Sequence, residues 1–137
     1  MHLQLFAPSI IGMLLHIHNN LFIEDVQDHF SECFPWLKIE FYKNPHHWKN
    51  GSSEKDRIDP KTKIRDISRN QKVGILQIKS TDTFAHVENC LKTLFDLNVR
   101  VFRKENSCWV QATTTENYTL RNKVIKSQEI ETPSKPF

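Results

Sequence analysis

The sequence predicts an α+β protein of the ferredoxin-like class, a βαββαβ sandwich built from two duplicated βαβ halves. One apolar pattern with helical spacing, followed by strand-like alternation, occurs twice, at 22–43 and again at 83–104. An apolar strand precedes each helix, so each half reads strand–helix–strand, which is typical of the split βαβ plait. The repeat defines the halves, and the order in which their strands pair is an inference.

The two predicted helices share one apolar face. In each, four apolar residues lie three or four positions apart, which places them on one side of a helix. The two sets align at a constant offset: Ile23, Val26, Phe30 and Phe34 in the first copy, and Phe84, Val87, Leu91 and Phe95 in the second. Short polar residues at 19–20 and 81–83 precede the helices and predict capping of their first turns.

The predicted strands also align between the halves. Residues 13–18 correspond to 74–79 before the helices, and 37–42 correspond to 97–102 after them. In the later pair the core-facing residues are Leu37, Ile39 and Phe41, and their counterparts Leu97, Val99 and Val101. The opposite face carries Lys38, Glu40 and Tyr42 in the first half, and Asn98, Arg100 and Phe102 in the second.

The pattern divides the chain into an N-terminal tail (1–12), one α+β domain (13–127) and a disordered tail (128–137). Within the domain, 13–43 and 72–104 are the βαβ halves, 44–71 is a basic loop with a short helix, and 105–127 adds a hairpin strand and a short closing helix. Asp59-Pro60 predicts the start of the short helix. Since Met13 opens the first repeat directly, either Met1 or Met13 is expected to be the native start.

Three segments carry a resemblance to known proteins: FPWLKIEFYKNPHH, DPKTKIRDI, and TFAHVENCLKTLFDLNVRVFRKENSCWVQATTTENYTL. The chain resembles a family of small uncharacterised bacterial proteins over residues 13–128. The resemblance implies the duplicated fold and a bacterial, cytoplasmic protein, and it carries over no catalytic residue.

Composition favours a protein that is not an enzyme. The chain has 137 residues, enough for one domain, and only three glycines, too few for a glycine-rich phosphate loop. Three cysteines without a secretory signal predict reduced thiols and a cytoplasmic location. No apolar run approaches the ~18 residues of a membrane helix, so we expect no membrane partner. We also expect no cofactor and no catalytic residue.

The positive charge is concentrated in one segment. Residues 43–73 contain nine Lys and Arg against four Asp and Glu. Nucleic-acid binding through residues 49–69 is therefore one hypothesis, with phosphate contacts from Lys49, Lys55, Arg57, Lys61, Lys63, Arg65 and Arg69. The interspersed acids instead favour a solvated loop. Polar residues at 16, 18, 77 and 79 stand where RNA-binding plaits carry aromatic residues, which counts against the standard mode.

Four histidines suggest another hypothesis, a metal-binding protein or metal-dependent enzyme. His16 and His18 share one strand face, and His46 and His47 follow the partner strand. Imidazoles that converge bind zinc or copper. The alternative is that they are ordinary polar residues of a strand and a loop.

Aromatic residues on the outer sheet face give the leading hypothesis, a non-catalytic binding module. Tyr42 and Phe102 occupy matching outward positions, and Trp109 and Trp48 are expected nearby. An apolar sheet face commonly binds another protein or a second copy of the chain. In this hypothesis the basic loop steers an acidic partner surface. The alternative is that the N-terminal tail or the closing helix covers these rings.

Overall fold

The computed structural model describes residues 12–45, 53–111 and 118–121. In these ranges two helices and five strands follow one another along the chain. Their bounds are β1 (Gly12–Ile17), α1 (Ile23–Cys33), β2 (Leu37–Tyr42), β3 (Gly74–Lys79), α2 (Phe84–Phe95), β4 (Asn98–Glu105) and β5 (Cys108–Gln111). The strand–helix–strand order of both halves and the hairpin strand are therefore confirmed. The expected tails at 1–11 and 128–137 lie outside the described residues, and Gly12, assigned to the tail, belongs to β1.

The strands form two antiparallel sheets. β1 pairs with β3 in one sheet, and β2, β4 and β5 lie in that order in the other. The fold is thus α+β, but the single four-stranded sheet of the ferredoxin-like arrangement is wrong. Hydrophobic alternation shows which face of a strand is buried, but it does not show which strand pairs with it. The sequence pattern therefore could not distinguish one sheet from two.

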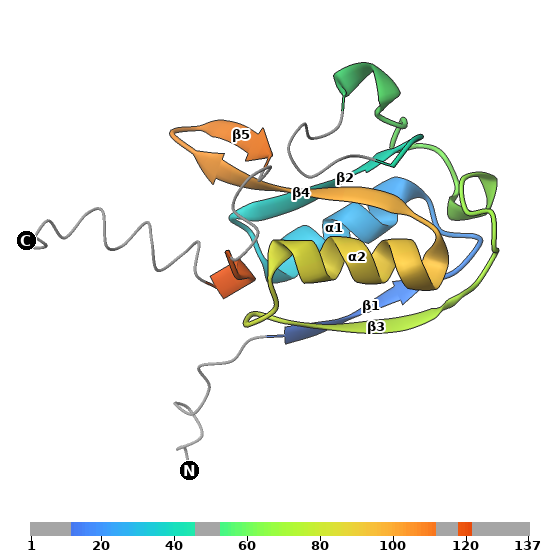
Figure 1. Ribbon diagram of the computed structural model, residues 1–137, viewed down its shortest axis with the longest axis horizontal. Helices are drawn as coiled ribbons and strands as arrows, with labels where there is room; N and C mark the ends of the chain where they lie inside the picture. The colour runs from blue at the N-terminus through green and yellow to red at the C-terminus, as the bar shows by residue number, and fades with distance from the viewer. Residues whose placement is uncertain (1–11, 46–52, 112–117, 122–137) are drawn as a thin grey trace, which may run out of the picture.

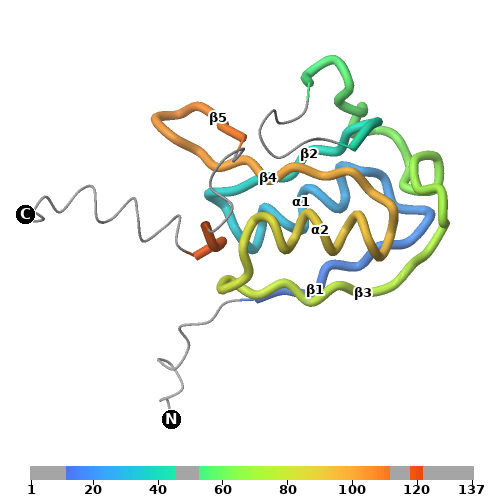
Figure 2. The backbone as a smooth tube through the Cα atoms, viewed as in Figure 1, coloured from blue at the N-terminus to red at the C-terminus, as the bar shows by residue number. Residues whose placement is uncertain are grey.

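The sheets and helices enclose one core. Figure 1 shows the β2–β4 pair above the helices and the β1–β3 pair below them, with α2 in front of α1. The tube in Figure 2 follows the same path, with β1 and β3 side by side at the lower edge. The predicted apolar face of each helix is buried, and so are the core-facing residues of β1, β2, β3 and β4. Burial of these side chains is the main stabilising contribution.

Local interactions fix the helix starts. In α2, Thr83 Oγ1 accepts a hydrogen bond from the His86 amide (3.0 Å), as its capping role predicts. In α1, the cap is Phe22 instead of the expected asparagines, and the Asp25 carboxylate accepts a hydrogen bond from the Phe22 amide (2.9 Å). Asp96 ends α2 in the left-handed region (φ 58°), which allows the chain to turn sharply into β4.

The basic segment is anchored to the fold at several of its described residues. Its helical structure is limited to two 3₁₀ turns, η2 (Glu54–Asp56) and η3 (Ile64–Asp66), and the helix expected at Asp59-Pro60 is a turn. Ile64 is fully buried in the core. The Ile58 amide donates to the Phe41 carbonyl (2.8 Å), which extends the β2 edge. The sequence treated as a loop therefore forms part of the framework.

The C-terminal part is a hairpin followed by a second core contact. Asn106 and Ser107 both have positive φ values (52° and 71°), the conformation of a tight turn that follows the twist of a hairpin. Leu120 is fully buried, and most of the expected closing helix lies outside the described residues. No helix in the described ranges is long and apolar enough to cross a membrane.

Candidate functional site

The outer face of the β2–β4–β5 sheet carries a patch of aromatic and basic side chains. Lys38 lies opposite Phe102 across β2 and β4, and Lys104 lies opposite Trp109 across β4 and β5. Because opposite residues of antiparallel strands share a face, all four project from the same side of the sheet. We call these four residues the Trp109 patch. Trp109, expected near Phe102, lies on the same side of the sheet.

Cation–π contacts organise the Trp109 patch. The Lys38 ammonium lies 5.1 Å from the Trp109 ring centroid and 5.3 Å from the Phe102 centroid. The Lys104 ammonium lies 5.6 Å from the Trp109 centroid. Trp109 remains 37% exposed, while Phe102 is half-buried. The patch therefore presents a large ring with two positive charges beside it, a combination suited to carboxylates and other anions.

Tyr42 does not belong to this surface. Its side chain is only 2% exposed, so its expected role as an exposed partner contact is wrong. It pairs with Asn98 on β4, four residues along the strand from Phe102. Its hydroxyl is buried and has no hydrogen-bond partner among the described residues. Burial, followed by the nearby charge of Glu40, raises the pKa of Tyr42 to about 12.

A polar layer lies between Tyr42 and the Trp109 patch. Glu40 is buried, and three polar side chains contact its carboxylate. Its carboxylate lies 3.1 Å from the Lys38 ammonium, 3.4 Å from the Arg57 guanidinium and 3.1 Å from the Gln27 amide nitrogen. The contact with Lys38 fixes that side chain against the sheet, so the layer positions one of the two charges beside Trp109.

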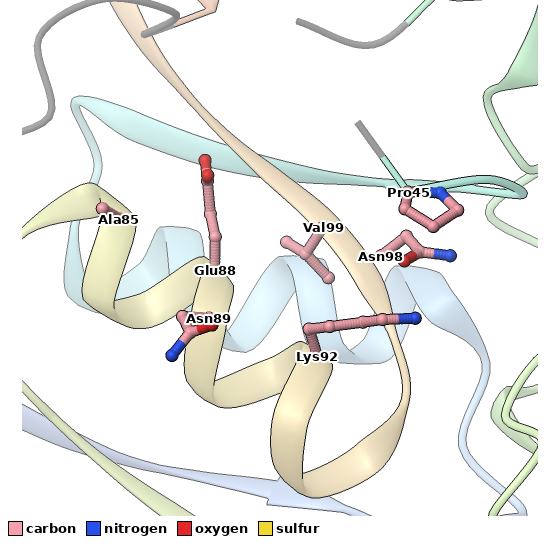
Figure 3. A pocket seen from close by; sticks show the side chains of 7 residues that line it. All are labelled: Pro45, Ala85, Glu88, Asn89, Lys92, Asn98 and Val99. Carbon is pink, nitrogen blue, oxygen red and sulfur yellow. The ribbon is translucent and has the colours of Figure 1, made fainter. Parts of the chain in front are cut away.

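A small pocket opens on another side of the molecule, between α2 and the start of β4. It has a volume of about 180 Å³, and a neighbouring pocket of about 280 Å³ shares Pro45, Lys92 and Asn98 with it. Figure 3 shows the Lys92 side chain reaching toward Asn98 and Pro45, with Glu88 pointing away toward the sheet. Lys92 is engaged by Asp96 (2.9 Å), and Glu88 by Arg100. Its two charged side chains are thus already neutralised, and the pocket lacks a group poised for catalysis among its described lining residues.

The basic residues of the connecting segment are dispersed and partly neutralised. Arg57 contacts Glu40 and Glu54, and Lys61 contacts Glu24 (3.4 Å). Lys63 lies over the Phe22 ring, 5.6 Å from its centroid. Lys55, Arg65 and Arg69 are exposed, and Lys49 lies outside the described residues. Among the described residues of this set, Arg69 lines the pocket of about 280 Å³, together with Lys43 and Lys92.

The predicted metal ligands are not brought together where they are described. His16 and His18 are exposed on and just after β1, and His46 and His47 lie outside the described residues. The described ranges contain no group of three or more His, Cys, Asp or Glu side chains arranged to hold a metal ion. Trp48, the remaining predicted partner residue, also lies outside the described residues.

No protein-family model, curated protein or solved structure matches the chain. The candidate site is therefore identified from its geometry alone. Sequence reasoning found Phe102 and Trp109 and missed Lys38 and Lys104. The signal for Lys104 was available, because it lies two residues after Phe102 on the same strand and so shares its face.

Proposed function

We propose that this protein is a non-catalytic binding module that docks an acidic segment of another protein on the Trp109 patch. The observation that carries the proposal is the exposed Trp109 ring held beside the Lys38 and Lys104 ammonium groups. A partly exposed tryptophan surrounded by polar residues is the usual anchor of a protein interface. Lys104 supplies the main charge that selects a carboxylate-bearing partner, and Lys38, which also pairs with Glu40 (3.1 Å), lies beside it over the same ring.

The arrangement of charges favours an acidic protein segment over a nucleic acid. Both ammonium groups lie over the Trp109 ring, where a stacked base would otherwise bind, so a base would have to displace them. A carboxylate approaches the same ammonium groups without disturbing the ring. Lys104 is exposed and lies over the Trp109 ring, so its ammonium group is accessible to a partner.

The test uses a ten-residue polyglutamate peptide as the probe, with polyglutamine and a single-stranded oligothymidylate as comparisons. Amide chemical shifts of the full-length labelled protein are followed during titration. We expect polyglutamate to shift the resonances of the Trp109 patch and polyglutamine to leave them unchanged. Trp109→Ala and a Lys38→Gln/Lys104→Gln pair should each weaken binding at least about tenfold, as expected for an interface anchor.

Leu14→Ala is the matched control, because Leu14 is an exposed apolar residue on the opposite sheet. It should leave polyglutamate binding unchanged. If oligothymidylate bound instead and shifted residues 55–69, the nucleic-acid hypothesis would replace this one. Salt-independent dimerisation with shifts at the Trp109 patch, measured by light scattering, would identify a second copy as the occupant.

We also propose that the protein acts in the bacterial cytoplasm, within the uncharacterised family that its sequence resembles. The free thiols of Cys33, Cys90 and Cys108 support a reducing compartment. Thiol titration of protein purified from its native source, under conditions that preserve disulfides, should count three free thiols in the chain. A lower count would place the protein in an oxidising compartment.

A further inference from the structure

Residues that the sequence repeat aligns with each other also face each other in the structure. In the β1–β3 sheet Leu15 lies opposite Leu76, its counterpart in the repeat. In the β2–β4 pair Glu40 lies opposite its counterpart Arg100. In an antiparallel pair, a residue faces its own counterpart only where a twofold axis crosses the strands. The two positions therefore define an approximate twofold axis that passes through both sheets.

The correspondence continues into segments that the sequence repeat did not include. After β2, residues 62–64 join the start of α1, and after β5, residues 118–120 join the start of α2 in the same way. In the first half, the Ile23 amide donates to the Thr62 carbonyl (2.9 Å), and the Ile64 amide donates to the Leu21 carbonyl (2.9 Å). In the second half, the Phe84 amide donates to the Tyr118 carbonyl (3.0 Å), and the Leu120 amide donates to the Asp82 carbonyl (3.0 Å). Ile64 and Leu120 are thus equivalent, and both are fully buried.

The return strands correspond as well. Tyr42 on β2 bridges to Arg57, and its counterpart Phe102 on β4 pairs with Gln111. Arg57 and Gln111 are therefore equivalent positions. Residues 57 and 62–64 of the basic segment are therefore the structural counterparts of residues 111 and 118–120.

Each half contains a polar triad that joins its helix, its second strand and its return segment. The first triad is Gln27, Glu40 and Arg57, with Glu40 contacting Gln27 at 3.1 Å and Arg57 at 3.4 Å. The second triad is Glu88, Arg100 and Gln111, with Arg100 contacting Glu88 at 3.2 Å and Gln111 at 3.3 Å. Both triads consist of one Gln, one Glu and one Arg. From helix to strand to return segment, the order is Gln, Glu, Arg in the first half and Glu, Arg, Gln in the second. The strand residue is therefore an acid in one half and a base in the other.

From these matches we infer that the chain is two copies of one unit, each running from its first strand through its return segment, and that Glu40 and Arg100 specify which unit pairs with which. Pairing of unlike units places a carboxylate opposite a guanidinium on the axis. Pairing of two first units would place Glu40 opposite a second Glu40, and pairing of two second units would oppose two Arg100 side chains. Like charges directly opposite in a sheet are unfavourable, so the axis pair selects the unlike arrangement.

The surface through which the two units contact each other is thus an interaction surface. Its preferred partner is a unit that carries the opposite charge at the position on the axis. The other half of the same chain is that partner here. This inference is independent of the Trp109 patch and of what binds there.

The experiment exchanges triads in the full-length chain. The first variant, Gln27→Glu/Glu40→Arg/Arg57→Gln, gives the first half the triad of the second and sets two arginines opposite each other. The exchange variant adds Glu88→Gln/Arg100→Glu/Gln111→Arg, which restores opposite charges on the axis. Lys38, which also contacts Glu40 (3.1 Å), has a side chain that is 28% exposed, so we expect it to turn to solvent when residue 40 becomes Arg.

We expect the first variant to lose roughly 1–2 M in its urea midpoint, because it opposes two buried charges of the same sign. The exchange variant should recover to near the wild-type midpoint, although it carries twice as many substitutions. Lys61→Glu, a charge reversal at an exposed ion pair with Glu24, is the control and should shift the midpoint little.

Two results would overturn the inference. An exchange variant that unfolds at or below the midpoint of the first variant would show that the triads are not interchangeable parts of equivalent units. A first variant as stable as wild type would show that charge on the axis does not determine pairing.

Discussion

Arg100 and Glu88 form a buried ion pair that ties α2 to β4. Their side chains are 0% and 5% exposed, and Arg100 Nη1 lies 3.2 Å from Glu88 Oε1. The other carboxylate oxygen of Glu88 accepts a hydrogen bond from the Val101 amide (2.8 Å). Glu88 therefore neutralises the buried Arg100 side chain and also accepts a hydrogen bond from the β4 backbone. Removing one partner of such a buried ion pair strongly lowers the free energy of unfolding. Replacing both partners with apolar residues lowers it much less.

Removing one partner of this pair should destabilise the protein strongly. Glu88→Ala leaves the Arg100 charge buried without its carboxylate, and we expect a loss of about 3 kcal/mol or more in the free energy of unfolding. Glu88→Met/Arg100→Met should lose clearly less, because both charges are absent. Urea denaturation measures both, with Lys61→Ala at an exposed ion pair as the control. A double variant less stable than Glu88→Ala would contradict the explanation.

Tyr42 should tolerate loss of its hydroxyl. The hydroxyl is buried and no described residue hydrogen-bonds to it, so Tyr42→Phe should leave stability unchanged or raise it. Phe102, the counterpart of Tyr42 in the repeat, already lacks this group. Tyr42→Ala is the contrast and should cost about 3–5 kcal/mol through the cavity that it leaves. Thermal unfolding of the three proteins decides the matter.

Tyr42 should also weaken the protein at alkaline pH. Its pKa rises from 10.0 to about 12 in the folded state, so its contribution to stability is fully present below pH 10 and is lost as pH rises toward 12. Absorbance at 295 nm should show one tyrosine that ionises near pH 12 and is missing from Tyr42→Phe. Loss of the Tyr42 signal already near pH 10 would show that its side chain is accessible.

Asp96 should contribute to stability only while it is charged. A hydrogen bond from Lys92 holds the pKa of this carboxyl below its usual value of 3.8. Its contribution is therefore present above pH 3.8 and is lost as pH falls through the lower folded-state value. Asp96→Asn retains a residue that accepts the left-handed conformation and removes the charge. The difference in stability between wild type and Asp96→Asn should be present at pH 7 and shrink below pH 4; a constant difference would assign it to another cause.

The basic segment should behave as part of the cooperative fold. Ile64 is fully buried, so Ile64→Ala should cost about 2–5 kcal/mol, as should Leu120→Ala at the equivalent position. Ile58→Ala, at a half-buried position of the same segment, should cost less. Urea denaturation measures the losses, and hydrogen exchange should show the Ile64 amide protected to the same degree as the α1 core. Loss of protection at Ile64 alone would mean that the segment opens independently.

Part of the candidate site followed from the sequence. Alternation along 98–105 placed Phe102 outward, and the turn after it brought Trp109 onto the neighbouring strand. The same alternation gave Tyr42 an outward position, but outward is not the same as exposed, since an outer sheet face is itself covered where other segments cross it. The distinction depends on contacts between residues far apart in the chain, which a period of two does not encode.

The sequence by itself determined the local structure of this protein: two amphipathic helices, the strands on either side of each, and the faces that they bury. Spacing of apolar residues decides these features, because it is set by the geometry of a helix or strand alone. Only the tertiary structure decided that β1 joins β3 and β2 joins β4 in separate sheets, and that Glu40 lies opposite Arg100 across β2 and β4. Strand pairing depends on the combined fit of both halves, and no local period carries that information.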